Sequence, residues 1–153
     1  MLLLSLPLAV SLHICEEFLL PGGFQNWYRS YRPDIAASLT TRFLVTINAV
    51  LIAVAIAPAI IGATPQGISL WLTVAAILFG NSWFHIIAAV KTKKYNPGLA
   101  TSILFYLPLP VYGYMHFLAT GGASPETAVA AFAIGSTYQW WSLYNHRRRS
   151  QKA

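Results

Sequence analysis

LLLSLPLAVSLHICEEFLL, residues 2 to 20, is an almost unbroken apolar run that contains one histidine and two adjacent carboxylates. Its length is close to the ~20 residues that a helix needs to cross a bilayer. Ionisable side chains at that depth cost a few kcal/mol each on insertion scales, so they call for a reason. On a helix, Glu16 and Glu17 fall within roughly 60° of His13, which predicts one polar stripe with partners elsewhere in the chain.

The composition of the chain indicates an integral membrane protein. Of its 153 residues, 56% are hydrophobic and only 9% are charged, whereas soluble domains carry about 25% charged residues. We predict a single domain over residues 1–146 and a basic tail over 147–153. The only cysteine, Cys15, excludes a disulfide within the chain. A signal peptide is the alternative for the first helix, but the segment lacks a basic start and a small-residue cleavage site.

Five apolar stretches predict an all-α bundle of five transmembrane helices. Turn and helix-start residues separate them, including Thr64-Pro65 and Ser124-Pro125. The predicted spans are Leu2 to Leu20, Phe43 to Ala63, Ile68 to Val90, Leu99 to Ala119 and Thr127 to Tyr144.

The ten basic residues predict the orientation of the bundle. They occur only in the first connection, in the third connection and in the C-terminal tail, which five spans place on one side of the membrane. The positive-inside rule then puts the N-terminus outside and the C-terminus in the cytoplasm, as expected for a multi-pass protein of the cell (inner) membrane. This spacing argues against nucleic acid as a partner. In this interpretation His146 is a solvated residue of the basic tail.

Polar residues on different predicted helices reach a similar depth on the cytoplasmic side. His13 lies about 10 Å before the inner end of its helix. His85 lies at a matching distance from the inner end of the third helix, with Asn81 one turn away on the same face. Asn48 of the second helix is equally deep. We therefore expect these side chains to converge in one pocket with Glu16 and Glu17.

Two imidazoles and two carboxylates make a ligand set for zinc, manganese or iron. His13 and Glu17, four residues apart, can reach one ion from a single helix, and His85 can supply a third ligand. Glu16 would then be the catalytic base and Asn81 would orient the substrate, with Asn48 as a supporting residue. The sequence leaves open which glutamate binds and which acts as base.

These residues carry a resemblance to a known family. His13-x-x-Glu16-Glu17, Asn81-x-x-x-His85 and Tyr95-Asn96-Pro97-Gly98 resemble the HXXEE domain family of small integral membrane proteins. The resemblance follows motifs from about Leu12 to Gly98. It implies an enzymatic role for these polar residues and no particular substrate. Taken alone, Tyr95 to Gly98 predicts a turn that leads into the next helix.

The predicted function is that of a metal-dependent membrane hydrolase acting on a lipid-like or amphipathic substrate. In this hypothesis the substrate comes from the bilayer or from the cytoplasmic interface. The alternatives are a small cation or proton transporter or channel subunit, and a non-catalytic accessory protein whose polar cluster only holds helices together. Membrane lipid is the expected partner, and a second copy of the chain could fill grooves between short helices.

Overall fold

The computed structural model describes residues 2–151, and this part of the chain is all-helical. Its elements are η1 (Leu2–Leu4), α1 (Ser5–Phe18), α2 (Phe24–Tyr31), η2 (Pro33–Ser38), α3 (Thr41–Ile61), α4 (Pro65–Thr92), α5 (Leu99–Thr101), η3 (Ser102–Tyr106), α6 (Pro108–Ala119) and α7 (Pro125–Ser150). The all-α prediction is therefore confirmed for the described residues.

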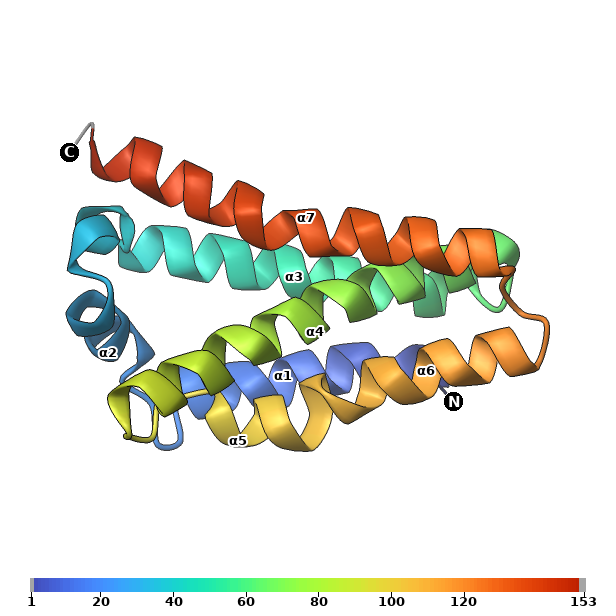
Figure 1. Ribbon diagram of the computed structural model, residues 1–153, viewed down its shortest axis with the longest axis horizontal. Helices are drawn as coiled ribbons and strands as arrows, with labels where there is room; N and C mark the ends of the chain where they lie inside the picture. Colours follow the sequence, from blue (N-terminus) through green and yellow to red (C-terminus); the bar gives the residue numbers. More distant parts are fainter. Residues whose placement is uncertain (1, 152–153) are drawn as a thin grey trace.

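Helix α4 crosses the molecule diagonally between two layers of helices (Figure 1). One layer contains α3 and α7, and the other contains α1 and the continuous rod formed by α5, η3 and α6. The short helix α2 and the turn η2 cover one end of the bundle. Helices α1, α4 and α7 end at this covered end, and α3 and α5 begin there, so one end of each of these helices lies under α2 and η2.

Hydroxyl side chains cap the N-termini of the three longest helices, because each satisfies a backbone N–H that has no partner within its helix. Thr40 accepts a hydrogen bond from Phe43 N, Thr64 from Gly67 N and Ser124 from Thr127 N. Pro65 and Pro125 follow two of these caps at the first helical position. Proline is favoured there because a backbone N–H at this position would have no partner within the helix. The predicted breaks at Thr64-Pro65 and Ser124-Pro125 are confirmed.

The fourth apolar stretch is one helical rod with a π-helical turn in it. Over Ser102–Tyr106 the backbone hydrogen bonds join residues five positions apart instead of four. Leu107 N, for example, donates to Ser102 O at 2.9 Å. Pro108 follows directly and has no N–H to offer the preceding turn. The π turn separates α5, which lies beside α1, from α6, which packs on α4.

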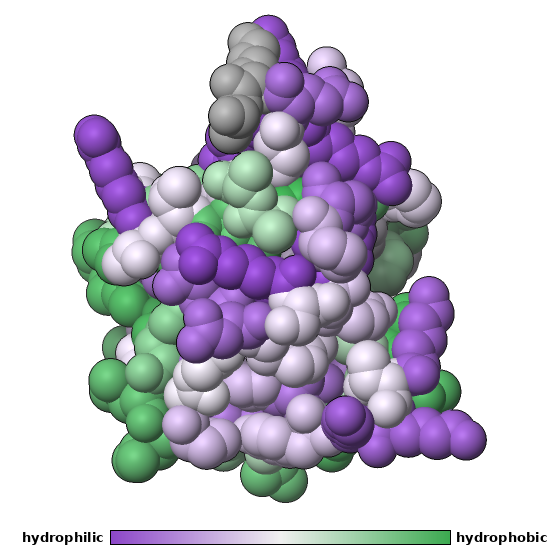
Figure 2. Space-filling model, turned by 90° about the vertical axis from the view of Figure 1, so that its left-hand side faces the viewer, coloured by the Kyte–Doolittle hydropathy of each residue, from purple (hydrophilic) through white to green (hydrophobic). Residues whose placement is uncertain are grey.

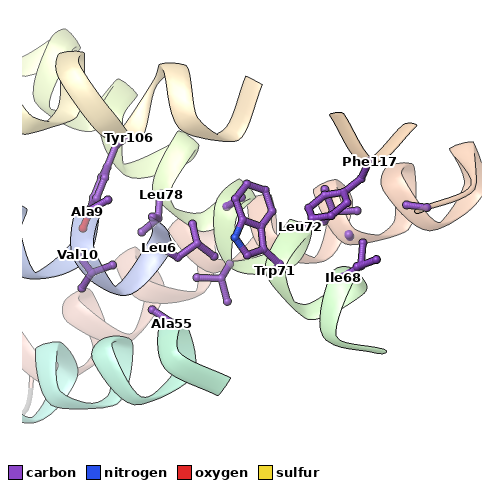
Figure 3. Close-up of a cluster of buried hydrophobic side chains, with 14 residues drawn as sticks. Leu6, Ala9, Val10, Ala55, Ile68, Trp71, Leu72, Leu78, Tyr106 and Phe117 are labelled. Carbon is purple, nitrogen blue, oxygen red and sulfur yellow. The ribbon is translucent and has the colours of Figure 1, made fainter. Parts of the chain in front are cut away.

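The apolar core fills the space between α4 and the other helices. Trp71 is fully buried in its middle, near Leu6 and Leu72, and Phe117 meets the edge of its ring with the centroids 5.4 Å apart (Figure 3). Helix α7 approaches α4 closely at Gly135, where a Cβ would lie 2.5 Å from a backbone oxygen of α4. The core therefore fixes α4 relative to α1, α6 and α7.

Three of the helical rods in residues 2–151 are long and apolar enough to cross a membrane: Thr41–Ile61, Pro65–Thr92 and Leu99–Ala119. This agrees with a membrane protein. Helix α1 has only 14 residues, and α7 mixes polar and basic residues into its second half. The prediction of five spans, and that of their orientation, stay predictions. Hydrophilic side chains gather over the end covered by α2, while apolar ones lie around its flanks (Figure 2).

At the C-terminal end of the chain the structure corrects one expectation, which concerns His146. Helix α7 continues to Ser150, so the basic residues up to Arg149 form its last turns, and Lys152 lies outside the described residues. The expectation that His146 is solvated is wrong. Its side chain is buried and lies 2.6 Å from Ser38 Oγ, because η2 packs against the end of α7.

Candidate metal centre

His13, Glu17 and His85 come together in a buried cluster near the C-terminal ends of α1 and α4. One ligand atom of each residue lies within 4.8 Å of the other two. Glu17 Oε1 is 3.4 Å from His13 Nε2 and 3.5 Å from His85 Nε2. His85 is fully buried, and His13 and Glu17 are 2% and 6% exposed. The structure thus brings together the three residues that the sequence predicts as metal ligands.

Each imidazole is held from behind through its other ring nitrogen. His85 Nδ1 lies 2.7 Å from Asn96 Oδ1, and Asn96 Nδ2 donates to the backbone oxygen of His85 at 3.0 Å. Since Asn96 Oδ1 can only accept, Nδ1 carries the proton of His85. His13 Nδ1 lies 2.7 Å from Thr101 Oγ1, whose own hydrogen points to Glu16, so His13 Nδ1 is also the donor. This pattern is typical of metal-binding histidines.

Both rings turn their second nitrogen, Nε2, toward the same oxygen, Glu17 Oε1. His85 Nε2 is buried and has no hydrogen-bond partner among the described residues. Two imidazole nitrogens and a carboxylate oxygen in a low-dielectric interior are stabilised by a cation that all three can contact. Ligand atoms about 2.0–2.1 Å from a zinc ion at tetrahedral angles are roughly 3.3 Å apart. The donor set, its spacing and the hydrogen bonds at both Nδ1 atoms therefore fit a divalent metal ion.

Glu16 points to a different place from Glu17, although the two are adjacent on α1. Its Oε1 accepts hydrogen bonds from Tyr95 Oη at 2.6 Å and from Ala100 N at 2.9 Å. Its Oε2 accepts from Thr101 N at 2.7 Å and from Thr101 Oγ1. These four bonds occupy the acceptor positions of a carboxylate. Glu16 therefore binds the N-terminus of α5 and, through Thr101, positions His13.

The segment Tyr95 to Gly98 contributes three separate contacts to the centre. Burial and then the hydrogen bond to Glu16 raise the pKa of Tyr95, so its hydroxyl stays protonated as a donor. Asn96 orients His85. Gly98 has φ of +96°, and a Cβ there would lie 2.5 Å from His85 Cε1 and 2.8 Å from His13 Cε1. Only glycine lets this turn approach both rings.

The remaining predicted residues lie beside the cluster at different distances. Asn81 Nδ2 is 3.4 Å from His13 Nε2, which is long for a hydrogen bond. Asn48 donates to Leu44 O of its own helix and faces a neighbouring cavity instead. Tyr106 was not predicted as a site residue, yet its ring stacks on His13 with the centroids 4.2 Å apart.

Sequence reasoning missed the residues that support the ligands: Tyr95, Asn96, Gly98, Thr101 and Tyr106. A usable signal existed for the first three, because they belong to the motif that carries the family resemblance. They were interpreted as a turn, which they do form. Thr101 and Tyr106 gave no signal, since a threonine and a tyrosine in an apolar helix are common without any site nearby.

Comparison with known proteins identifies the family of the chain. Residues 4–113 match a family described as "Protein of unknown function with HXXEE motif". The match covers more than half of the chain and contains all three clustered residues, so the chain belongs to this family. No curated protein and no solved structure matches it.

Proposed function

We propose that this member of the HXXEE family is a metal-dependent membrane enzyme, and that His13, Glu17 and His85 hold the metal ion. The observation that carries the proposal is the convergence of two imidazole Nε2 atoms on Glu17 Oε1, with both Nδ1 atoms held by hydrogen-bond partners behind the rings. Two imidazole nitrogens and one carboxylate oxygen within 4.8 Å of one another form a nitrogen and oxygen ligand set that first-row divalent ions bind. Zinc, manganese and iron are the candidate ions.

The reaction class that this site supports best is hydrolysis of an amphipathic, lipid-like substrate. A divalent ion would supply a Lewis acid and lower the pKa of water toward neutrality. Because Glu16 already accepts four hydrogen bonds, we reassign the role of base to Glu17. No hydrogen bond joins Glu17 Oε2 to another described residue, so this oxygen is available to take a proton. Asn81, beside His13, would orient the bond to be cleaved.

Buried ligands among apolar helices favour a substrate that reaches the site from the membrane. In this proposal α1 and α7 also cross the bilayer, the N-terminus is outside, and the centre lies in the cytoplasmic half of the membrane. The basic residues of α2, α4 and α7 lie toward the end covered by α2, as that orientation requires.

Elemental analysis of the detergent-purified protein tests the metal site. Wild type should contain close to one zinc, manganese or iron ion per chain, and His13→Ala, Glu17→Gln and His85→Ala should lose it. His116→Ala is the matched control, because this histidine lies near the outer end of α6 and away from the cluster. Absence of metal from wild type after reconstitution with each ion would refute the site.

Hydrolysis of acyl esters and amides in mixed micelles tests the reaction class separately. We expect turnover in wild type and His116→Ala, and loss of turnover in the three ligand variants. A protein that binds metal stoichiometrically but turns over no ester or amide would keep the metal site and contradict the hydrolase assignment.

A further inference from the structure

A cavity of about 140 Å³ opens directly onto the cluster from the side of α7. Glu17 and Asn81 line one part of it, so the proposed metal centre and the cavity share these residues. Its walls come from α3, α4 and α7, with aromatic rings of α2 closing the end. A cavity of similar size in another protein holds a benzene molecule, so this one can hold a group of about six non-hydrogen atoms.

The chemistry of the lining favours an uncharged polar group. Carboxamides and hydroxyls project into the cavity from different helices: Asn48, Asn81, Tyr138, Gln139 and Ser142. Aliphatic side chains such as Ile47 and Leu51 fill the gaps between them. No lysine or arginine lines the cavity, and its acidic residue is Glu17. Such walls can donate and accept hydrogen bonds but do not neutralise a phosphate or a carboxylate.

The cavity is reachable from the side of the bundle because α7 packs mainly on α4 and η2, and meets α3 through the ring of Phe43, which contacts His146 and Arg149. A surface hollow of about 170 Å³ between α3 and α7 shares Phe43, Ile47, Tyr138 and Ser142 with it. At the mouth of this hollow, the Arg149 guanidinium lies 3.7 Å from the centre of the Phe43 ring. An apolar chain can therefore extend outward between α3 and α7 while its polar end reaches Glu17.

We propose that this cavity binds the substrate of the centre, an amphipathic molecule with an uncharged end bearing hydroxyl or carbonyl groups, which enters sideways between α3 and α7. This inference rests on the proposed function and adds its substrate class and path. It also assigns selectivity to α7, which lies outside the residues 4–113 that match the family. Gln139 and Ser142 become substrate-binding residues that the family motifs do not include.

Photo-crosslinking in phosphatidylcholine vesicles tests the proposal with defined probes. Three probes carry the same diazirine-labelled acyl chain and differ at the head: a monoacylglycerol, a free fatty acid and a lysophosphatidic acid. We expect the monoacylglycerol to label residues of α3 and α7 that face the cavity, with competition by the unlabelled compound. Ser142→Trp should reduce this labelling about tenfold, which corresponds to about 1.4 kcal/mol of binding free energy.

Two further variants keep the result interpretable. Thr137→Trp places the same bulk on the exposed face of α7 and should label like wild type. Asn48→Leu keeps the side-chain volume but removes the carboxamide, and should also weaken labelling by the monoacylglycerol. Equal labelling of wild type and Ser142→Trp, or preferential labelling by either anionic probe, would overturn the proposal. Metal content, measured on the same samples, decides the proposed function independently.

Discussion

Replacing Gly98 with alanine should remove the metal from the centre while leaving the fold in place. The new Cβ would lie 2.5 Å from His85 Cε1, and ordinary contacts begin near 3.4 Å. The ring would have to move by about 0.9 Å, whereas metal–ligand distances vary by only about 0.2 Å. Asn96 behind His85 and Tyr106 against His13 leave little room for that movement.

The cost in stability separates into a backbone part and a packing part. The left-handed backbone of Gly98 costs a residue with a Cβ about 1–2 kcal/mol. Overpacking against the two rings adds about 1–3 kcal/mol. Gly23→Ala isolates the backbone part, because Gly23 has φ of +88° and a Cβ there meets nothing within 4 Å.

Metal content and thermal unfolding in detergent should be measured for both variants. We expect Gly23→Ala to unfold at a lower temperature but to keep its metal, and Gly98→Ala to lose the metal as well. If Gly98→Ala binds metal with the affinity of wild type, the two imidazoles do not need their present positions, and the assignment of His13 and His85 as ligands is refuted.

Three further predictions concern the surroundings of the centre. Asn96→Leu should lower metal affinity by about 10–100-fold in a chelator competition. Asn145→Leu is the control, because it loses only a hydrogen bond to its own helix, and should keep the affinity of wild type. Equal affinities of the two variants would exclude Asn96 from a positioning role. Glu16→Gln should keep the metal but lower the free energy of unfolding by about 1.5–3 kcal/mol, because it loses charge-assisted hydrogen bonds. Loss of the metal with an unchanged free energy of unfolding would make Glu16 a ligand instead. Burial, together with the charges of Arg149 and Arg32, lowers the pKa of His146 to about 4. Between pH 6.5 and 4 the unfolded chain therefore binds a proton at this residue that the folded chain does not. The free energy of unfolding should fall as the pH drops through this range. His146→Gln should flatten that fall in thermal unfolding across pH, and an unchanged profile would contradict a neutral, buried His146.

The convergence of His13, Glu17 and His85 could be predicted from the sequence because helical spacing and membrane depth are both local quantities. Four residues along α1 place His13 and Glu17 on one face, and distance from a helix end sets the level of His85. Rotation about the helix axis could not be predicted. Glu16 lies only 100° from Glu17, and that angle sends it to α5 instead of the cluster.

Contacts between distant segments account for the other differences. Tyr95 meets a residue 79 positions away, and Ser38 meets His146 over 108 positions. Nothing in the sequence near either residue indicates its partner. Helix α7 continues through its basic residues to Ser150, because long basic side chains are good helix formers. The turn η2 packs against this end of α7 and buries His146.

The π turn at Ser102–Tyr106 behaves as a one-residue insertion in an otherwise regular helix. It changes the phase between the two halves of the rod by about 100°. The first half can thus aim Thr101 at Glu16 and His13, while the second half aims its own residues at Trp71 in the core. Deleting one residue here would restore regular α-helical phase and force one of these two alignments to be lost.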